Sequence, residues 1–198
     1  MAAVYRYKEV CKYVAVDACS IQNICASRTL LGKSICAGFE YNIPEYALYE
    51  AVYKPLRKSN KTIESQRAII KEQVSEGKIR KAKLSIDDLQ EMLALRSVKP
   101  NLGNGELACI VYSKNKPLAV LTDDKAARNY TKKLLGENKA FETAEIVASL
   151  VFNHDITDGE CMDIISEEKQ CNTNMDKPYL EAYQQALRGT MFENGNLN

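Results

Sequence analysis

The stretch Leu118-Ala119-Val120-Leu121-Thr122-Asp123-Asp124 is the clearest indication of fold in this 198-residue chain. Four apolar residues in a row, ended by polar ones, predict a short strand that is buried on both faces. A second run, Tyr13-Val14-Ala15-Val16, has the same character and also ends in an acid, Asp17. Helical patterns lie between these runs, and strands that alternate with helices predict a parallel sheet. We therefore expect an α/β fold with a central parallel sheet flanked by helices.

The rest of the chain is predicted to be mainly helical. One more strand is expected over residues 39–43, and the segment 106–112 is expected to be a central, buried helix because it is apolar nearly all round. The other predicted helices are 20–31 with Ser20 as its N-cap, 45–56, 62–76, 85–95, 125–135, 143–152, 159–168 and 178–187. We expect one domain over residues 1–170, with a basic helical insertion at about 57–85, and a C-terminal helical tail over 171–198.

Cysteine and histidine usage restricts the chemistry. The chain has seven cysteines, an odd number, and no two of them have CxxC spacing. This favours reduced thiols over disulfides or zinc ligands. His154 is the only histidine, which argues against zinc and against a histidine-based nucleophile relay. A metal would therefore be held by oxygen, as magnesium, manganese and calcium are. With no apolar run long enough for a bilayer and no signal peptide, we expect a cytoplasmic protein that does not enter membranes.

Charge is unevenly distributed, although the net charge is only +1. Residues 54–83 hold ten Lys or Arg against three Glu, and residues 137–198 hold four against twelve acids. The basic segment suits a polyanion such as nucleic acid, and it equally suits the solvated face of helices. On the first interpretation, phosphate contacts come from Lys78, Arg80, Lys81 and Lys83.

Acidic residues stand where a parallel sheet would bring them together. Asp17 and the pair Asp123–Asp124 each follow a predicted strand, and ligand sites lie beyond the carboxyl ends of such strands. Glu106 opens the buried helix, and Glu50 lies on the helix after the second strand. Converging carboxylates repel one another and need a cation, so this set predicts a magnesium or manganese site.

Each acid also has a purely structural interpretation. Asp17 is placed to cap the helix that follows it, and Glu106 to favour its own helix through the dipole. Asp124 and Arg128 have the i,i+4 spacing of a structural ion pair, and Glu50 suits a solvated surface. These interpretations remain open one by one, whereas the conjunction of acids at two strand ends favours the metal site.

Four pieces of the chain resemble the PIN-domain superfamily, in the branch with GE and DDxxAR motifs. They cover about residues 13–135, and Cys19 departs from the pattern because the family has a small polar residue at that place. The pieces are Val14-Ala15-Val16-Asp17, Ile43-Pro44 with Glu50-Ala51-Val52, Leu102-Gly103-Asn104-Gly105-Glu106-Leu107-Ala108, and Leu121-Thr122-Asp123-Asp124-Lys125-Ala126-Ala127-Arg128.

The resemblance implies a three-layer PIN-like fold and an endoribonuclease that depends on Mg²⁺ or Mn²⁺. It implies the catalytic acids Asp17, Glu50, Glu106 and Asp124, with metal ligands drawn from Asp17, Glu106, Asp124 or its neighbour Asp123. A metal-bound water is the expected nucleophile, and Arg128 joins the residues expected to contact RNA. Many such proteins look like toxins inhibited by a small antitoxin protein. The RNA target and a homo-oligomeric state remain open.

Three alternatives belong to other classes. A phosphatase with an aspartyl nucleophile would need a second Asp two residues after Asp17, where Cys19 stands. A PIN-like fold without activity would act as a module that binds nucleic acid or protein. A DNA nuclease would use the same acids, because nothing in the sequence identifies contacts to the 2′-hydroxyl.

Overall fold

The structure is a computed structural model that describes residues 7, 10–55, 61–114 and 116–195, without the side chains of 192–195. Residues 56–60 of the predicted basic insertion and 196–198 of the predicted tail therefore lie outside the described residues. The chain forms two compact units. The sheet unit comprises residues 11–22 and 39–142, and the helical unit comprises residues 1–10, 23–38 and 143–198.

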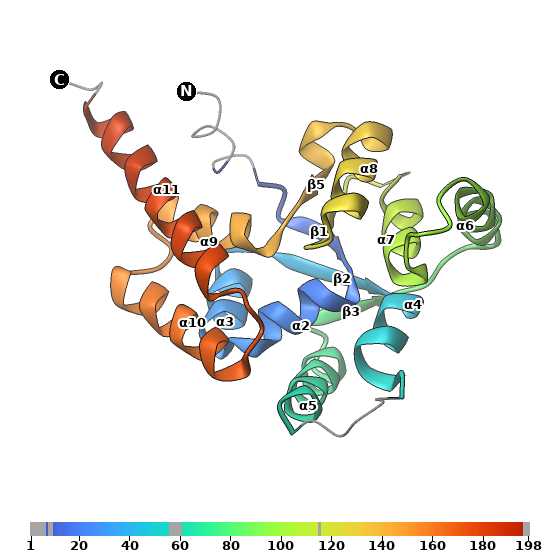
Figure 1. The fold of residues 1–198 in the computed structure, drawn as a ribbon, viewed down its shortest axis with the longest axis horizontal. Coiled ribbons are helices and arrows are strands. Elements are labelled where there is room, and N and C mark those ends of the chain that lie inside the picture. The colour runs from blue at the N-terminus through green and yellow to red at the C-terminus, as the bar shows by residue number, and fades with distance from the viewer. Residues whose placement is uncertain (1–6, 8–9, 56–60, 115, 196–198) are drawn as a thin grey trace. The chain divides into compact units, whose positions relative to one another are not determined.

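A five-stranded parallel sheet forms the centre of the sheet unit, in the order β3-β2-β1-β4-β5 (Figure 1). The strands are β1 (Tyr13–Val16), β2 (Glu40–Pro44), β3 (Ile79–Ala82), β4 (Ala119–Leu121) and β5 (Ala140–Phe141). The two apolar runs that indicated the fold are β1 and β4, which are central and pair directly with each other. The predicted α/β class with a central parallel sheet flanked by helices is confirmed.

Most helices of the sheet unit pack against this sheet. The buried helix α7 (Asn104–Lys114) contacts β1, β2 and β4 (Figure 1), as its nearly uniform apolar character predicted. The others are α4 (Glu45–Leu48), continued by the π-helical turn η1 (Tyr49–Tyr53), α5 (Lys61–Ser75), α6 (Ile86–Val98), α8 (Lys125–Leu135) and the 3₁₀ turn η2 (Glu137–Lys139). Helices α4, α5 and α8 pack against the sheet as α7 does, and α6 packs against α7. Ser85 caps α6 in a capping box with Asp88.

The helical unit consists of α3 (Arg28–Cys36), α9 (Thr143–Phe152), α10 (Asp158–Cys171) and α11 (Asp176–Gly195), together with the last residues of α2 (Ala18–Ala26). The main contact in this unit is between α9 and α11. The domain boundary predicted after residue 170 falls at the end of α10, and α11 belongs to the same unit as α9. Among the described residues, no helix combines the length and apolarity needed to cross a membrane.

The predicted helix over residues 20–31 is wrong in two respects. It is two helices, because Ser27 has extended backbone angles and its hydroxyl accepts a hydrogen bond from the Leu30 amide, which starts α3. Its first helix begins before Ser20, and the residue that accepts from the first-turn amide of Ser20 is Asp17. The cap therefore comes from the acid at the end of β1 rather than from the serine.

The segment predicted as a basic helical insertion is only partly helical. Residues 61–75 form α5, but Ile79–Ala82 form β3, an edge strand of the sheet. The strand was not predicted because it is short and only its outer residues, Ile79 and Ala82, are buried. Its inner residues are Arg80 and Lys81, and charged side chains are common on edge strands because they discourage pairing with another chain. β5 also escaped prediction because it has two residues.

Candidate functional site

The ends of β1 and β4 join the two acidic segments of the sequence. Val16 lies opposite Leu121 in the parallel register, so Asp17 and Thr122 emerge side by side from the carboxyl edge of the sheet. The Asp17 amide donates to the Leu121 carbonyl at 3.2 Å. The Thr122 hydroxyl donates to Asp17 Oδ2 at 2.6 Å. These bonds tie together residues that are 105 positions apart in the sequence.

Asp17 is buried, with 3% of its surface exposed. Its other oxygen, Oδ1, accepts a hydrogen bond from the Ser20 amide at 2.7 Å. The pKa of Asp17 is raised to about 6. Burial is the main cause and the charge of Asp123 adds to it, whereas the hydrogen bonds from Thr122 and Ser20 lower the pKa. Asp17 thus performs the helix-capping role that its position suggested, and it also carries an unfavourable negative charge at neutral pH.

Ser20 ties the start of α2 to the turn after β4. Its hydroxyl oxygen accepts a hydrogen bond from the Asp123 amide at 2.9 Å. Sequence reasoning identified neither Ser20 nor Thr122 as a residue that positions the acids. The available signal was that each hydroxyl stands within three residues of an acid at a strand end.

The pair Asp123–Asp124 divides into two roles. Asp124 is the N-cap of α8, and its Oδ1 accepts from the Ala127 amide at 2.7 Å. Asp123 precedes it and acts electrostatically on Asp17. Arg128, predicted to bind RNA, donates to the Thr122 carbonyl at 3.0 Å and forms an ion pair with Glu142 at 2.6 Å. The described ion pair of Arg128 is therefore with Glu142, and it braces the turn that carries both aspartates.

Glu106 lies in the first turn of α7 and is half-buried. Its Oε2 accepts a hydrogen bond from the Gly103 amide at 2.8 Å. Burial raises the pKa of Glu106, the Gly103 bond lowers it, and the charges of Asp124 and Glu50 raise it again. The glutamates of α7 and η1 are therefore neighbours of each other and of the β4 turn.

Glu50 lies on the π-helical turn η1 and faces the start of α7. A Cβ atom on Gly105 would lie 2.6 Å from Glu50 Oε2 and 3.2 Å from the Cα of Ala47. The Glu50 carboxylate could turn away from such a Cβ atom, but the Ala47 backbone is closer than in nine of ten real Cβ contacts and would have to shift by a few tenths of an ångström. Glycine at position 105 therefore favours the close approach of α7 to α4.

Several of these acids lie near enough to the Cys19 thiol to affect its pKa. Packing around this thiol, followed by the charges of Asp17, Asp123, Glu106 and Glu50, raises its pKa to about 11. Those carboxylates come from four separate segments: the end of β1, the turn after β4, the first turn of α7 and η1. The structure thus brings the predicted acids into one neighbourhood.

The acids do not form a ready-made coordination shell. In the part of the chain that the structure describes, no group of three or more His, Cys, Asp or Glu side chains is close enough to hold a metal ion. Backbone amides hold Asp17, Glu106 and Asp124 in place through Ser20, Gly103 and Ala127. The described bonds to Glu106 and Asp124 use one carboxylate oxygen each, Oε2 and Oδ1 respectively.

The predicted basic residues are spread along β3. Lys78 precedes the strand and pairs with Glu76 at 2.8 Å, and Arg80 pairs with Glu40 at 2.5 Å. Lys83 follows the carboxyl end of β3, the same edge of the sheet that carries the acids. An extended chain from residue 78 to 83 covers roughly 17 Å, so these side chains do not form one cluster. Only Lys83 of the four lies at the acidic edge.

In comparisons with protein-family models, with curated proteins and with solved structures, nothing matched this chain.

The first prediction follows from the buried carboxyl of Asp17. Its pKa is raised in the folded protein, so its stabilising contribution is present below about pH 4 and is lost as pH rises through about 6. Asparagine does not titrate, so Asp17→Asn removes this pH dependence. The change in the free energy of unfolding caused by Asp17→Asn should be more favourable above pH 7 than at pH 4 by about 3 kcal/mol. Urea denaturation in EDTA from pH 4 to 8 measures the difference. A difference that does not change with pH would contradict the buried, costly charge.

The second prediction concerns the close approach at Gly105. Gly105→Ala should lower the free energy of unfolding by about 1 kcal/mol, because a collision of the methyl group with the Ala47 backbone that costs about 1–3 kcal/mol exceeds the roughly 1 kcal/mol that alanine gains over glycine within a helix. Gly103→Ala is the matched control, since a Cβ there meets Glu106 Oε2 at an ordinary 3.6 Å. Equal effects of the two substitutions in urea denaturation would contradict a special requirement at Gly105.

Proposed function

We propose that this protein is a divalent-metal-dependent endoribonuclease of the PIN type. One observation carries the proposal: the parallel pairing of β1 with β4 places Asp17 beside the turn Thr122–Asp124 at the carboxyl edge of the sheet, where the Thr122 hydroxyl binds the Asp17 carboxylate. Ligand sites of open parallel sheets lie at this edge. The motif resemblance of residues 13–135 supports the same interpretation.

The donor chemistry of the site fits magnesium or manganese. The charged donors are carboxylates, two of them have raised pKa values, and their mutual repulsion is what a cation would relieve. The residues that would hold the ion are Asp17, Glu106 and Asp124, with Asp123 as the alternative and Glu50 beside them. A divalent ion bound there would neutralise charge on the phosphate and make water a better nucleophile at neutral pH.

Side chains at the site favour a water molecule as the nucleophile. Thr122 and Ser20 fix both oxygens of Asp17, so this carboxylate is preorganised. Glu50 is half-buried and borders an open cleft, a position suited to orienting water. The only histidine of the sequence, His154, belongs to the helical unit, so the sheet unit itself contributes no histidine that could deprotonate a 2′-hydroxyl. Hydrolysis by water leaves 5′-phosphate and 3′-hydroxyl ends.

A second candidate is a nucleic-acid-binding module without turnover. One observation favours it: the described carboxylates do not form a group able to hold a metal without moving. Cleavage of RNA in the presence of manganese separates the two candidates. The resemblance further suggests a toxin with a small inhibitory partner, and a short reading frame beside the gene would support that extension.

The third prediction tests the metal and the reaction together. Calorimetry should detect manganese binding to the wild type, and Asp17→Asn should weaken it by at least about tenfold, the size of effect that even ligand-orienting groups have. Glu137→Gln is the control, because this exposed acid stands before β5, at the other edge of the sheet. With manganese, single-stranded RNA should be cut to 5′-phosphate ends, and EDTA should stop the reaction.

The outcomes of that experiment are distinct. Equal manganese affinity of wild type and Asp17→Asn would refute the site. Cyclic phosphate ends, or cleavage that continues in EDTA, would refute the mechanism. Manganese binding without cleavage would favour the binding module, and faster cleavage of a DNA strand of the same sequence would favour a DNA nuclease.

The fourth prediction concerns the basic residues of β3. Lys83→Ala should weaken RNA binding and reduce the slope of log K against log salt by about 0.7, the value for one lost phosphate contact on a single strand. Lys78→Ala should leave the slope unchanged, because Lys78 lies at the opposite end of β3 and pairs with Glu76. Filter binding in EDTA at several salt concentrations measures both slopes. Equal slopes for the two variants would mean that Lys83 does not contact RNA and that the charges of β3 serve only to discourage pairing with another chain.

A further inference from the structure

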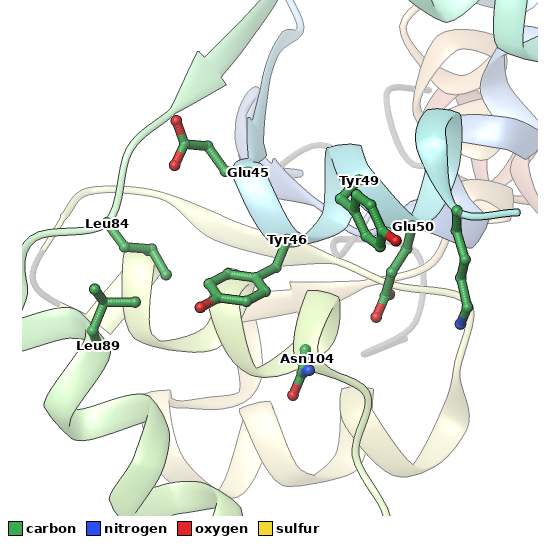
Figure 2. Close-up of a pocket in the computed structure, with 8 residues that line it drawn as sticks. Glu45, Tyr46, Tyr49, Glu50, Leu84, Leu89 and Asn104 are labelled. Carbon is green, nitrogen blue, oxygen red and sulfur yellow. The ribbon is translucent and has the colours of Figure 1, made fainter.

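A cleft of about 540 Å³ adjoins the acidic site in the sheet unit (Figure 2). The side chains of Tyr46, Tyr49 and Asn104 line it, with Leu84 and Leu89 on one side and Glu50 on the other. Its volume lies in the range of pockets for small organic groups. Glu50 therefore belongs both to this cleft and to the set of acids described above.

Two tyrosines give the cleft its chemical character. Tyr46 is 40% exposed and Tyr49 is 53% exposed, although both have large apolar rings. With Glu50 they stand at positions i, i+3 and i+4 of the continuous helical segment α4–η1, so all three side chains share one face. In Figure 2 the Tyr46 ring extends to the side of the cleft where Leu84 and Leu89 lie, and the Tyr49 ring extends to the side of Glu50, with Asn104 below and between them.

Planar aromatic rings beside a carboxamide suit a nucleobase. Exposed aromatic side chains bind the bases of single strands by stacking, and this works for every base because each has a π-face. The amide of Asn104 has one acceptor and two donors, which can pair with the polar edge of a base. Leu84 and Leu89 add an apolar wall. Lys54, also at the cleft and exposed, supplies a positive charge for a phosphate.

We propose that this cleft is a subsite for one unpaired nucleobase, which stacks on the exposed ring of Tyr46 or Tyr49 with its polar edge towards Asn104. A base in this place would set its phosphate beside Glu50 and the acids around Cys19. Bases inside a duplex are stacked on each other and cannot enter, so the subsite selects single-stranded RNA. The inference rests on the proposed nuclease function and names the form of its substrate.

The test compares two substitutions at the same positions. The double variant Tyr46→Leu/Tyr49→Leu keeps apolar bulk but removes the π-faces, and Tyr46→Phe/Tyr49→Phe removes only the hydroxyls. Affinity for a short single-stranded RNA is measured in EDTA, so that binding is separate from cleavage. The leucine variant should bind at least about fivefold more weakly, since the stacking of one base has at least this effect. The phenylalanine variant should bind like the wild type.

Two further readouts separate the subsite from a general structural role. Tyr13→Leu is the matched control, because Tyr13 is 52% exposed and begins β1, at the opposite edge of the sheet from the acids. It should change nothing. A 2-aminopurine base in the RNA should lose fluorescence on binding to the wild type and the phenylalanine variant, because stacking quenches it, and should keep it with the leucine variant. Duplex RNA should bind equally weakly to all variants.

Each outcome decides the proposal. Unchanged single-strand binding by the leucine variant overturns the subsite, as does an equal loss of single-strand and duplex binding or a loss shared by the phenylalanine variant. The nuclease proposal fails separately. If the subsite binds RNA as expected but manganese produces no cleavage, the subsite remains and the nuclease is refuted. If manganese produces cleavage but the tyrosine substitutions do not change binding, the subsite is refuted and the nuclease proposal remains.

Discussion

The hydrogen bond between the Thr122 hydroxyl and the buried carboxylate of Asp17 is the contact on which the site depends. It joins the ends of β1 and β4, the two central strands, at the point where the chain leaves the sheet. A carboxylate with 3% exposure is unfavourable unless its oxygens are hydrogen-bonded, and Thr122 and Ser20 satisfy one oxygen each. The bond therefore makes a charged group tolerable in the interior and fixes its orientation.

The same solution recurs at the other acids. Glu106 accepts from the Gly103 amide at the start of α7, and Asp124 accepts from the Ala127 amide at the start of α8. Amides at the first turn of a helix lack partners within the helix, so each acid stabilises a helix start while it is held near the others. Structural and functional interpretations of these acids are therefore compatible. Burial is the main cause of the raised pKa values of Asp17 and Glu106 and repulsion by neighbouring acids adds to it, so a cation would stabilise the charged forms of both.

Close packing of α7 against α4 and η1 extends the site beyond the strand ends. Gly105 removes the side chain that would otherwise separate these helices, and this brings Glu50 to the acids and leaves the cleft beside it. The π-helical turn closes with a bond from the Lys54 amide to the Tyr49 carbonyl at 2.8 Å. Turns of this kind are rare and are often found at functional sites. The tyrosines on this face are exposed because the cleft is open.

The sequence by itself determined the α/β class, the two central strands, the buried helix α7 and the identity of the acids. Those features depend on local apolar runs and on polar residues directly after them, which are readable without knowledge of contacts. The tertiary structure alone decided the edge strands β3 and β5, the break at Ser27, and the partners Thr122 and Ser20. A two-residue strand such as β5 has no periodicity of its own, and Thr122 meets Asp17 only because β1 and β4 pair in parallel register. The cleft could not be predicted from the sequence either. Asn104 and Tyr46 line it together because α7 packs against α4, and no local pattern encodes that packing.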